Sequence, residues 1–280
     1  MSADRTTDHS ARDFAWAVPI MRAGYAGRGL VYLLVAGLSL WSILNGGEAE
    51  GTAETMQRFR SGWGIAVLLV IALAMLAYAI WRAVDGIWDL EDYGSDLKGV
   101  VARAGMIITG LVHLGLAALA IIVAVGVSRG GGDTGVVQQL FASSMGQLAA
   151  GIIGVITIAV GFYYLHKAWT QGYLDHLQGN PVTRHLNMAL RIGLAGQGVA
   201  VGIIGLLIVQ AATYSSRSEA GGLGSAFDWL QSKAYGQALV IALCLGLLGF
   251  GLFCFVNARY RIVPRADASG TPSLRQLLNG

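Results

Sequence analysis

Six long stretches of the chain contain no Asp, Glu, Lys or Arg: 29–47, 61–81, 104–128, 134–166, 192–216 and 234–258. A helix needs about 20 largely apolar residues to cross a bilayer, because every backbone N–H and C=O group must be paired inside the segment. Each stretch is long enough for one such helix. Charged residues make up 12% of the chain, about half the share in a soluble domain. The chain is therefore predicted to be an all-α membrane protein with six transmembrane helices.

The apolar stretches divide the chain into three tandem two-helix units between two tails. We expect the tails over 1–20 and 265–280, and the units over 21–99, 100–185 and 186–264. The spans are placed at about 24–45 and 63–83, 104–127 and 146–166, and 192–213 and 236–257. Both tails are expected in the cytoplasm, for the following reason.

Lys and Arg are distributed unevenly between the two sides of the predicted bundle. The side that holds both termini carries fourteen of the 19 Lys and Arg residues. Because basic residues stay on the cytoplasmic side, both termini are predicted to be cytoplasmic. The start of the chain lacks the apolar core of a cleaved signal peptide, so the first span is expected to be retained. Tryptophans are expected at the two membrane surfaces, with Trp16, Trp81, Trp88 and Trp169 inside and Trp41, Trp63 and Trp229 outside.

The odd-numbered spans begin with a repeated pattern, Arg-x-Gly-x-x-x-x-Gly, starting at Arg22, Arg103 and Arg191. Each even-numbered span carries a step from a small to an aromatic residue: Ala77–Tyr78, Gly161–Phe162 and Gly249–Phe250. Each unit crosses the membrane twice, so successive copies enter it in the same sense. The units are therefore predicted to be parallel repeats arranged about a pseudo-threefold axis along the membrane normal.

A short apolar-spaced segment precedes each even-numbered span, after turn residues at Thr52, Thr134 and Gly224. These segments are expected to form short amphipathic helices lying on the outer surface. Their apolar positions are Met56, Phe59 and Trp63 in the first unit, Val137, Leu140 and Phe141 in the second, and Phe227 and Leu230 in the third.

The threefold Arg-x-Gly-x4-Gly pattern, the two spans per unit and the closing run Asn257-Ala-Arg-Tyr-Arg261 resemble a bacterial membrane family known only as domain of unknown function 1206. The resemblance extends over roughly residues 20–264. It implies a six-span protein of the bacterial inner membrane. It implies no particular activity and no catalytic residues.

The repeated polar and small residues suggest two roles. Arg22, Arg103 and Arg191 would form a ring at the cytoplasmic mouth of a threefold bundle, suited to an anion or a lipid headgroup. Alternatively, each arginine extends to the headgroups and fixes the topology. Glycines let neighbouring helix backbones approach closely, and helix packing is predicted for Gly24, Gly29, Gly105, Gly110, Gly193, Gly198 and Gly202.

His113 is the histidine placed well inside a predicted span, at the position of Tyr32 in the first unit and Val201 in the third. With Tyr32, Thr109 and Gln197 it forms a set of intramembrane polar residues at related depths. An ionisable group in this position is a candidate proton carrier or ligand. The simpler interpretation is a neutral histidine that hydrogen-bonds a neighbouring helix.

Two further groups of titratable residues are expected on the cytoplasmic side. Asp85, Asp89, Asp92 and Asp96 are spaced as one helix face, which predicts a solvated face or a site for a cation or basic partner. His166, Asp175, His176 and His185 lack a metal-ligand spacing. Cys244 and Cys254 lie about 15 Å apart along one helix and cannot form a disulfide. No metal or other cofactor is predicted.

The absence of catalytic and transport motifs favours a non-enzymatic function. No predicted span contains a proline, Asp or Glu, which disfavours an ion-coupled transporter, and no nucleotide-binding, hydrolase or zinc motif occurs. The first hypothesis is a structural or accessory component that binds membrane lipids, a membrane-protein partner or a second copy of itself, with no role for nucleic acid. The alternative is a permeation or transport protein for a small solute or anion. A redox or lipid-modifying enzyme around His113 is a third, weaker hypothesis.

Overall fold

The computed structural model describes residues 14–126, 143–214, 222–266 and 272–279. Six long helices account for most of these residues, and each is long and apolar enough to cross a membrane. They are α2 (Ala17–Leu44), α4 (Trp63–Trp88), α5 (Leu97–Val125), α7 (Ser144–Thr170), α8 (Pro181–Tyr214) and α10 (Gly236–Tyr260). The all-α class and the six spans are thus confirmed.

All three odd-numbered spans begin well before their expected starts, and α2 begins at Ala17. α5 begins at Leu97, where the Asp96 side chain accepts a hydrogen bond from the Gly99 amide at 2.9 Å. α8 begins at Pro181, after the Asn180 side chain accepts one from the Thr183 amide at 3.0 Å. Capping side chains set the starts of α5 and α8. The charged residues that border each apolar stretch therefore mark where the chain leaves the apolar layer, and the helix itself continues beyond them.

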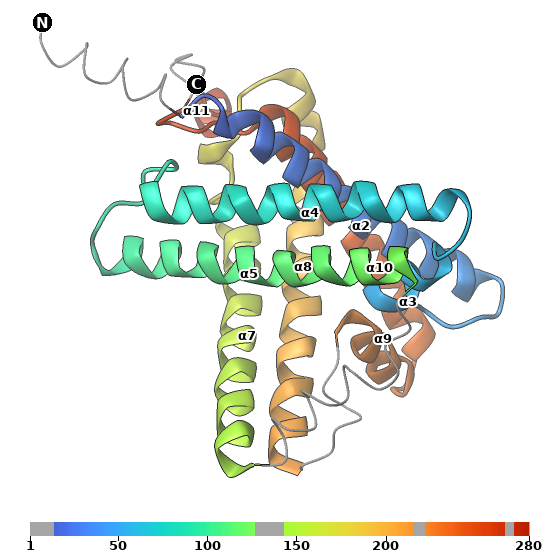
Figure 1. Ribbon diagram of the computed structural model, residues 1–280. Helices are drawn as coiled ribbons and strands as arrows, with labels where there is room; N and C mark the ends of the chain where they lie inside the picture. The colour runs from blue at the N-terminus through green and yellow to red at the C-terminus, as the bar shows by residue number, and fades with distance from the viewer. Residues whose placement is uncertain (1–13, 127–142, 215–221, 267–271, 280) are drawn as a thin grey trace, which may run out of the picture.

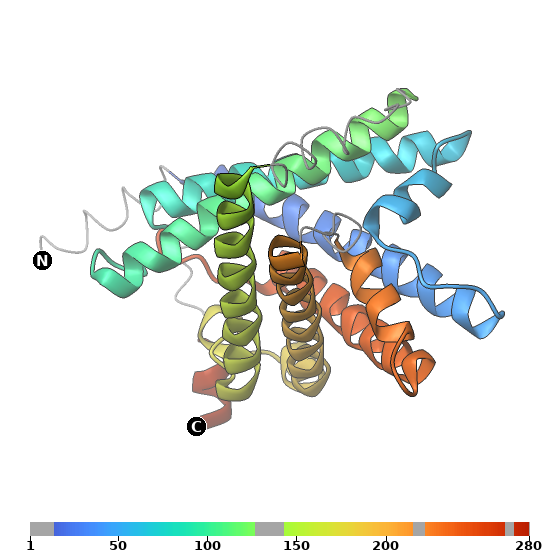
Figure 2. The ribbon, with the colours of Figure 1, turned by 90° about the horizontal axis from the view of Figure 1, so that it is seen from below.

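The long helices pack as a row in the order α5, α4, α2, α10, α8 and α7. α2 and α10 are the middle members of this row, the pair α4 and α5 follows α2, and the pair α8 and α7 follows α10. The pair α4 and α5 crosses the direction of α7 and α8 (Figure 1 and Figure 2). We call the end that holds the starts of α2, α5 and α8 the basic end, and the opposite one the far end.

The row departs from the expected pseudo-threefold arrangement at one place. Within the first unit α2 packs on α4, and within the third α8 packs on α10, but within the second unit α5 and α7 do not pack along one another. Of the three contacts within units that the pseudo-threefold arrangement predicts, the one between α5 and α7 is therefore not formed. α7 is the least embedded span as a result, with 17% of its most apolar window buried, against 56% in α10.

The far half of the interior is filled by apolar side chains, including those of two short helices. These are α3 (Thr52–Arg58) and α9 (Leu223–Gln231), whose side chains Met56 and Phe227 are fully buried in the core formed by α2, α4 and α10. The expected amphipathic helices exist, but their apolar sides turn into the bundle and not onto a membrane surface. The corresponding residues of the second unit, Thr134, Val137, Leu140 and Phe141, lie outside the described residues.

Most tryptophans fit a surface position, and one does not. Trp16, Trp63 and Trp169 are at least half exposed. Trp81 is completely buried, and its indole nitrogen has no hydrogen-bond partner within the described residues. The prediction of a surface position for Trp81 was wrong, because its side of α4 faces the core at the basic end.

The end of the chain packs back onto the basic end. α11 (Leu274–Asn279) lies near η1 (Leu174–His176), and Leu274 is fully buried. Arg275 donates to the Asp175 carboxylate at 2.5 Å. The expected C-terminal tail of 265–280 is thus a docked segment where it is described.

Candidate functional site

The basic end encloses a cluster of polar side chains in the interior of the molecule. We call it the polar cluster. It consists of Tyr25 and Arg28 from α2, Tyr78, Arg82 and Asp85 from α4, Glu91 from the loop after α4, and Asn257 and Arg261 from the end of α10. Within each helix these residues are three or four positions apart, so they share one face. The packing of α2 between α4 and α10 brings the three faces together.

The inner part of the polar cluster centres on the hydroxyl group of Tyr78. This oxygen accepts hydrogen bonds from Arg28 Nη1 at 2.8 Å and from Arg82 Nε at 3.1 Å. Arg82 also donates from Nη2 to the hydroxyl of Tyr25 at 2.8 Å and from Nη1 to the Asp85 carboxylate at 3.2 Å. One arginine thus connects α2 and α4 through two tyrosines and a carboxylate.

The outer part of the polar cluster is a buried ion pair between Glu91 and Arg261. Two guanidinium nitrogens of Arg261 donate to the two Glu91 oxygens, each at 2.6 Å. The side chains are 5% and 0% exposed for Arg261 and Glu91. The third nitrogen donates to Asn257 Oδ1 at 2.6 Å, and the Glu91 amide donates to Asp85 Oδ1 at 3.1 Å. A continuous series of hydrogen bonds therefore runs from Arg28 to Arg261.

Proton equilibria at the outer part of the site follow from this pairing. Burial alone would raise the pKa of Glu91, but the charge and hydrogen bonds of Arg261 hold it below the ordinary value. Burial opposes the charge of Arg261, and Glu91 nevertheless raises its pKa above the ordinary value. Burial, followed by the positive charge of Arg261, lowers the pKa of nearby His176 to about 4. The pair stays ionised at neutral pH, and His176 stays neutral.

Arg28 is the least compensated charge of the polar cluster. Among the described residues, it has no carboxylate partner, and its Nε has no hydrogen-bond partner. Its guanidinium carbon lies 4.9–5.8 Å from the ring centroids of Phe250, Tyr78 and Tyr32. Cation–π contacts contribute about 0.5–2 kcal/mol each, whereas burying an unpaired ion costs several kcal/mol. Three such contacts offset a cost of similar size, but Arg28 is the charge of the polar cluster without an oppositely charged partner among the described residues.

The four predicted intramembrane polar residues lie beside the polar cluster, with one exception. Gln197 donates to the Tyr32 hydroxyl at 2.9 Å, and its Oε1 has no partner among the described residues. His113 lies 4.5 Å from Tyr78 between ring centroids, and its Nδ1 is bonded to the Thr109 carbonyl at 2.7 Å. The Thr109 hydroxyl itself donates to the Gly105 carbonyl of its own helix. Tyr32, Gln197 and His113 thus border the site, whereas Thr109 does not contribute its side chain.

The three arginines of the repeat have separate contacts. Arg22 is exposed. Arg103 donates to the carbonyls of Gly86 and Ile87 at the end of α4 at 2.8 and 2.7 Å. Arg191 lies over the Trp169 ring at 5.7 Å. No contact described for one of them involves another, and their role toward an anion or lipid headgroup stays a prediction.

The second glycine of each repeat lies in a contact between units. A Cβ atom added at Gly29 would lie 3.0 Å from the Gly251 carbonyl oxygen, one at Gly110 would lie 3.2 Å from the Ala79 carbonyl oxygen, and one at Gly198 would lie 3.0 Å from the Gly161 carbonyl oxygen. A Cβ atom added at Gly202 itself would meet nothing within 4 Å, although one added at Gly161 would lie 2.7 Å from the Gly202 nitrogen. The second glycines therefore occupy the packing positions expected of them.

The first glycine of the repeat lies in a contact within its own unit in two of the three units. An added Cβ atom would lie 2.6 Å from the Tyr78 Cα atom at Gly24 and 2.1 Å from the Gly249 carbonyl carbon at Gly193. At Gly105 it would meet nothing within 4 Å. Packing was therefore expected at Gly105 but is not formed there, because α5 and α7 stand apart.

The acidic and histidine groups expected on the cytoplasmic side are dispersed. Asp85 and Asp89 are buried, so a solvated face was wrong for them, and Asp89 accepts from the Tyr93 and Gly94 amides. His176 stacks on Tyr93, and His185 bonds its own helix. No group of three His, Cys, Asp or Glu side chains among the described residues is placed to hold a metal ion.

Sequence reasoning missed Arg28, Arg82 and Glu91 as members of one buried site, and it placed Asp85 on a solvated acidic face or in a site for a cation or basic partner. A signal existed for two of them. Arg28 stands six residues after Arg22, the position that Thr109 and Gln197 take in the other units, and Asp85 stands at the position of Asn257. The repeat alignment, extended beyond its glycines, would have grouped them.

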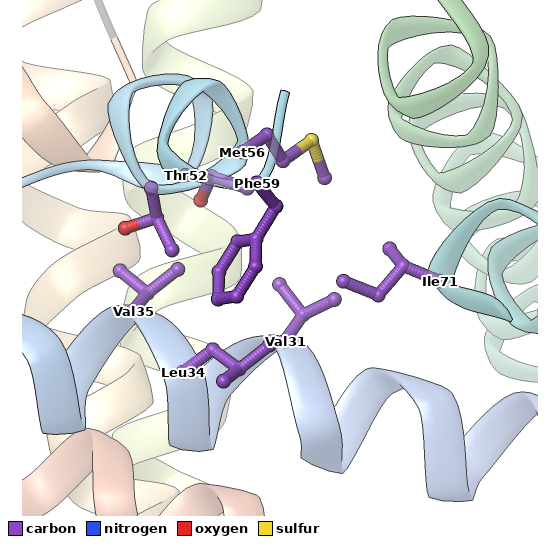
Figure 3. Close-up of a pocket in the computed structure, with 8 residues that line it drawn as sticks. Val31, Leu34, Val35, Thr52, Met56, Phe59 and Ile71 are labelled. Atoms are coloured by element: carbon purple, nitrogen blue, oxygen red, sulfur yellow. The ribbon is translucent and has the colours of Figure 1, made fainter. Parts of the chain in front are cut away.

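A separate pocket lies at the far end beneath α3 (Figure 3). It is lined by the apolar side chains of Val31, Leu34, Val35, Met56, Phe59 and Ile71, with Thr52 and Thr55 as its polar members. The Thr55 hydroxyl is buried without a hydrogen-bond partner in the described part of the chain. This pocket does not extend the polar cluster toward the far end.

The helices, their repeated glycine contacts and the three tandem units define a multi-span membrane protein built from two-helix repeats. The chain belongs to the family DUF1206, a domain of unknown function, which matches residues 23–89, 104–171 and 192–261. Each match covers two of the six candidate spans. No curated protein and no solved structure matches the chain.

Proposed function

We propose that this protein is a non-enzymatic component of a bacterial inner membrane, with both termini in the cytoplasm. It acts as a structural or accessory subunit that binds membrane lipid or another membrane protein. The basic end, which carries most of the Lys and Arg residues, faces the cytoplasm in this proposal.

The observation that carries the proposal is that the buried charges other than Arg28 bind one another. Arg82 pairs with Asp85 of its own helix and connects α4 with α2 through Tyr25, and Glu91 and Arg261 connect the loop after α4 with α10. Beyond them, the far half of the interior is apolar. Such an interior favours a scaffold over a passage, because a permeating solute needs polar groups along its whole route.

Lipid binding is supported by the composition of the basic end. Arg22 is exposed there, and Trp16, Trp88 and Trp169 are 51%, 49% and 77% exposed. A basic residue near an anionic membrane surface contributes about 1 kcal/mol of attraction, and tryptophans prefer the headgroup layer. We expect anionic phospholipids to bind at this end.

The test is native mass spectrometry of the protein in nanodiscs with and without anionic phospholipid. Retained anionic lipid, or a membrane protein that copurifies in fixed ratio, supports the proposal. Arg22→Gln should weaken lipid retention about fivefold, the effect of about 1 kcal/mol. The matched control is Arg60→Gln, an exposed arginine before α4 at the far end, which should not change it. Retention of neither lipid nor protein would refute the proposal.

A second candidate function is passage of a small anion, and Arg28 is the observation that favours it. A buried arginine without a carboxylate attracts anions. Proteoliposomes loaded with chloride or phosphate test it directly. Flux above that of empty liposomes, lost in Arg28→Gln and kept in Arg28→Lys, would establish the second candidate and displace the accessory role.

A further inference from the structure

α5 carries a face that is built like two occupied faces elsewhere in the molecule. In the first unit, Gly24 receives the backbone of Tyr78 on α4, and in the third unit Gly193 receives Gly249 and Phe250 on α10. Gly105 has the same place in the second unit, yet a Cβ atom added there would have nothing within 4 Å. This face of α5 is therefore prepared for a helix that is not there.

The matching part of the contact is present on α7. The step Gly161–Phe162 has the same place as Ala77–Tyr78 and Gly249–Phe250 in the other units. Tyr78 and Phe250 are fully buried, whereas Phe162 is 67% exposed. Both sides of the second unit's contact, Gly105 on α5 and Gly161–Phe162 on α7, thus exist in the chain, but they do not meet.

α7 does not meet α5 because the side of α7 that carries Gly161 packs against α8. An added Cβ atom at Gly154 would lie 2.6 Å from Val209, and one at Gly205 would lie 2.6 Å from the Ile158 nitrogen. We call the side of α7 formed by Gly154, Ile158 and Gly161 its closing face. It lies against Gly198, Gly202 and Gly205 of α8.

This small-residue face is peculiar to α8. At the places of Gly202 and Gly205, α2 has Leu33 and Ala36, and α5 has Leu114 and Ala117. Close packing of backbones is the main attraction between helices in a bilayer, so α8 competes with α5 for the closing face of α7.

A bilayer changes the balance between the two helices. In Figure 1, the axes of α4 and α5 are horizontal, whereas those of α7 and α8 are vertical. Transmembrane helices tilt by about 0–40° from the membrane normal, so a bilayer draws the two pairs toward a common direction. Helices that share a direction can lie against one another along their length, which the present crossed directions of α5 and α7 do not allow.

We propose that α7 has two packing positions, the present one on α8 and a second one on α5. In the second position Gly161 and Phe162 lie against Gly105, and the opening in the row moves from between α5 and α7 to between α7 and α8. Residues 126–143 join α5 to α7 in the same chain, and a short connection gives an effective concentration in the millimolar range. The helix that covers the face is therefore α7 of the same chain and not that of a second copy.

Cysteine pairs distinguish the two positions in membranes of cells that produce the full-length protein. Gly151→Cys with Ala212→Cys reports the present position, because the two Cβ atoms would be 3.8 Å apart, within the disulfide range of about 3.5–4.5 Å. We call it the α8 pair. Gly105→Cys with Phe162→Cys reports the second position, and we call it the α5 pair. Both residues of the α5 pair are exposed, so the substitutions should not disturb folding.

We expect both pairs to form disulfides within single molecules under a mild oxidant. Gly205→Leu should displace α7 from α8, as overpacking displaces a helix. It should raise the disulfide yield of the α5 pair relative to that of the α8 pair by about fivefold or more. Gly37→Leu is the matched control, because an added Cβ atom there meets nothing within 4 Å. It should leave the ratio unchanged.

Three results would overturn the proposal. A dimer-sized product from the α5 pair would show that a second copy covers the face. No product from the α5 pair, with a normal product from the α8 pair, would show that lipid covers it. An equal product from Ile107→Cys with Phe162→Cys, which places the thiol at similar depth on another side of α5, would show unspecific collision. Single-cysteine variants account for any reaction with native Cys244 or Cys254.

Discussion

The ion pair between Glu91 and Arg261 should be the strongest single connection at the basic end. Glu91→Gln leaves the buried guanidinium of Arg261 without a counter-charge, with neutral acceptors on Asn257 and on the new amide as its side-chain partners among the contacts described. Removing one partner of a buried pair costs about 3–5 kcal/mol, because the other charge stays buried and uncompensated. At about 2–4 °C per kcal/mol for a chain of this size, the midpoint of thermal unfolding should fall by about 6–20 °C.

The protein contains its own reporter for this measurement. Cys244 and Cys254 are buried and free, so a thiol-reactive fluorophore labels them only when the helices separate. Unfolding curves in detergent would be compared for the wild type, Glu91→Gln, Arg261→Met and the double variant. The double variant removes both charges, so its cost should be clearly smaller than the sum of the two single costs.

An exposed pair provides the matched control. Arg275 and Asp175 are also hydrogen-bonded, but their side chains are 38% and 51% exposed. Exposed pairs contribute about 0–1 kcal/mol, so Asp175→Asn should change the midpoint little. Strict additivity in the double variant, or equal effects of Glu91→Gln and Asp175→Asn, would refute the reasoning that burial makes the first pair important.

Three further results are expected in the same unfolding assay. Gly24→Ala and Gly193→Ala should each lower the free energy of unfolding by about 1–3 kcal/mol through overpacking. Gly105→Ala should not lower it, because of the three glycines only Gly105 has free space for an added Cβ atom. Equal losses in all three variants would contradict the open contact at Gly105. The free energy of unfolding should fall by about 1–3 kcal/mol as the pH drops from about 6.5 to 4. The unfolded chain binds a proton at His176 in this range, whereas the folded chain, in which the pKa of His176 is about 4, does not. His176→Gln should remove this pH-dependent loss, and an unchanged pH profile in the variant would exclude His176 as its cause. Glu91 adds a loss only below the ordinary carboxyl range, because its folded pKa is depressed. Arg82→Met should lower the free energy of unfolding at least twice as much as Arg28→Met. Asp85 loses its ion pair in Arg82→Met, whereas no carboxylate loses one in Arg28→Met. A larger loss in Arg28→Met would show that Arg28 is paired by a group outside the described residues.

The six spans could be predicted because the determining property is local. A bilayer requires each helix to pair its own backbone groups over about 20 apolar residues, and the charges at Arg82 or Arg191 limit these stretches visibly. The glycine contacts were partly predictable for the same reason. A repeated glycine indicates that some backbone approaches, but the helix that approaches is decided by the whole bundle.

The polar cluster could not be predicted because its contacts join distant parts of the chain. Glu91 and Arg261 are 170 positions apart, and Arg28 and Tyr78 are 50 positions apart. Read alone, Asp85 and Asp89 look like one side of a solvated helix. In the structure α4 ends at Trp88, and Asp89 takes a left-handed conformation that turns the chain back, so both carboxylates face the interior.

The copies agree in their packing residues and differ in their polar ones, and this difference bears on function. At three equivalent places the units carry Arg28, Thr109 and Gln197, and at another set Asp85, Trp169 and Asn257. A pore on a pseudo-threefold axis would need similar groups in all three units at one depth. Here the buried charges belong to the first and third units, in α2, α4, the loop after α4 and the end of α10. The repeat therefore accounts for how the helices pack, and the chemistry of the protein must be sought where the first and third units meet, around Arg28.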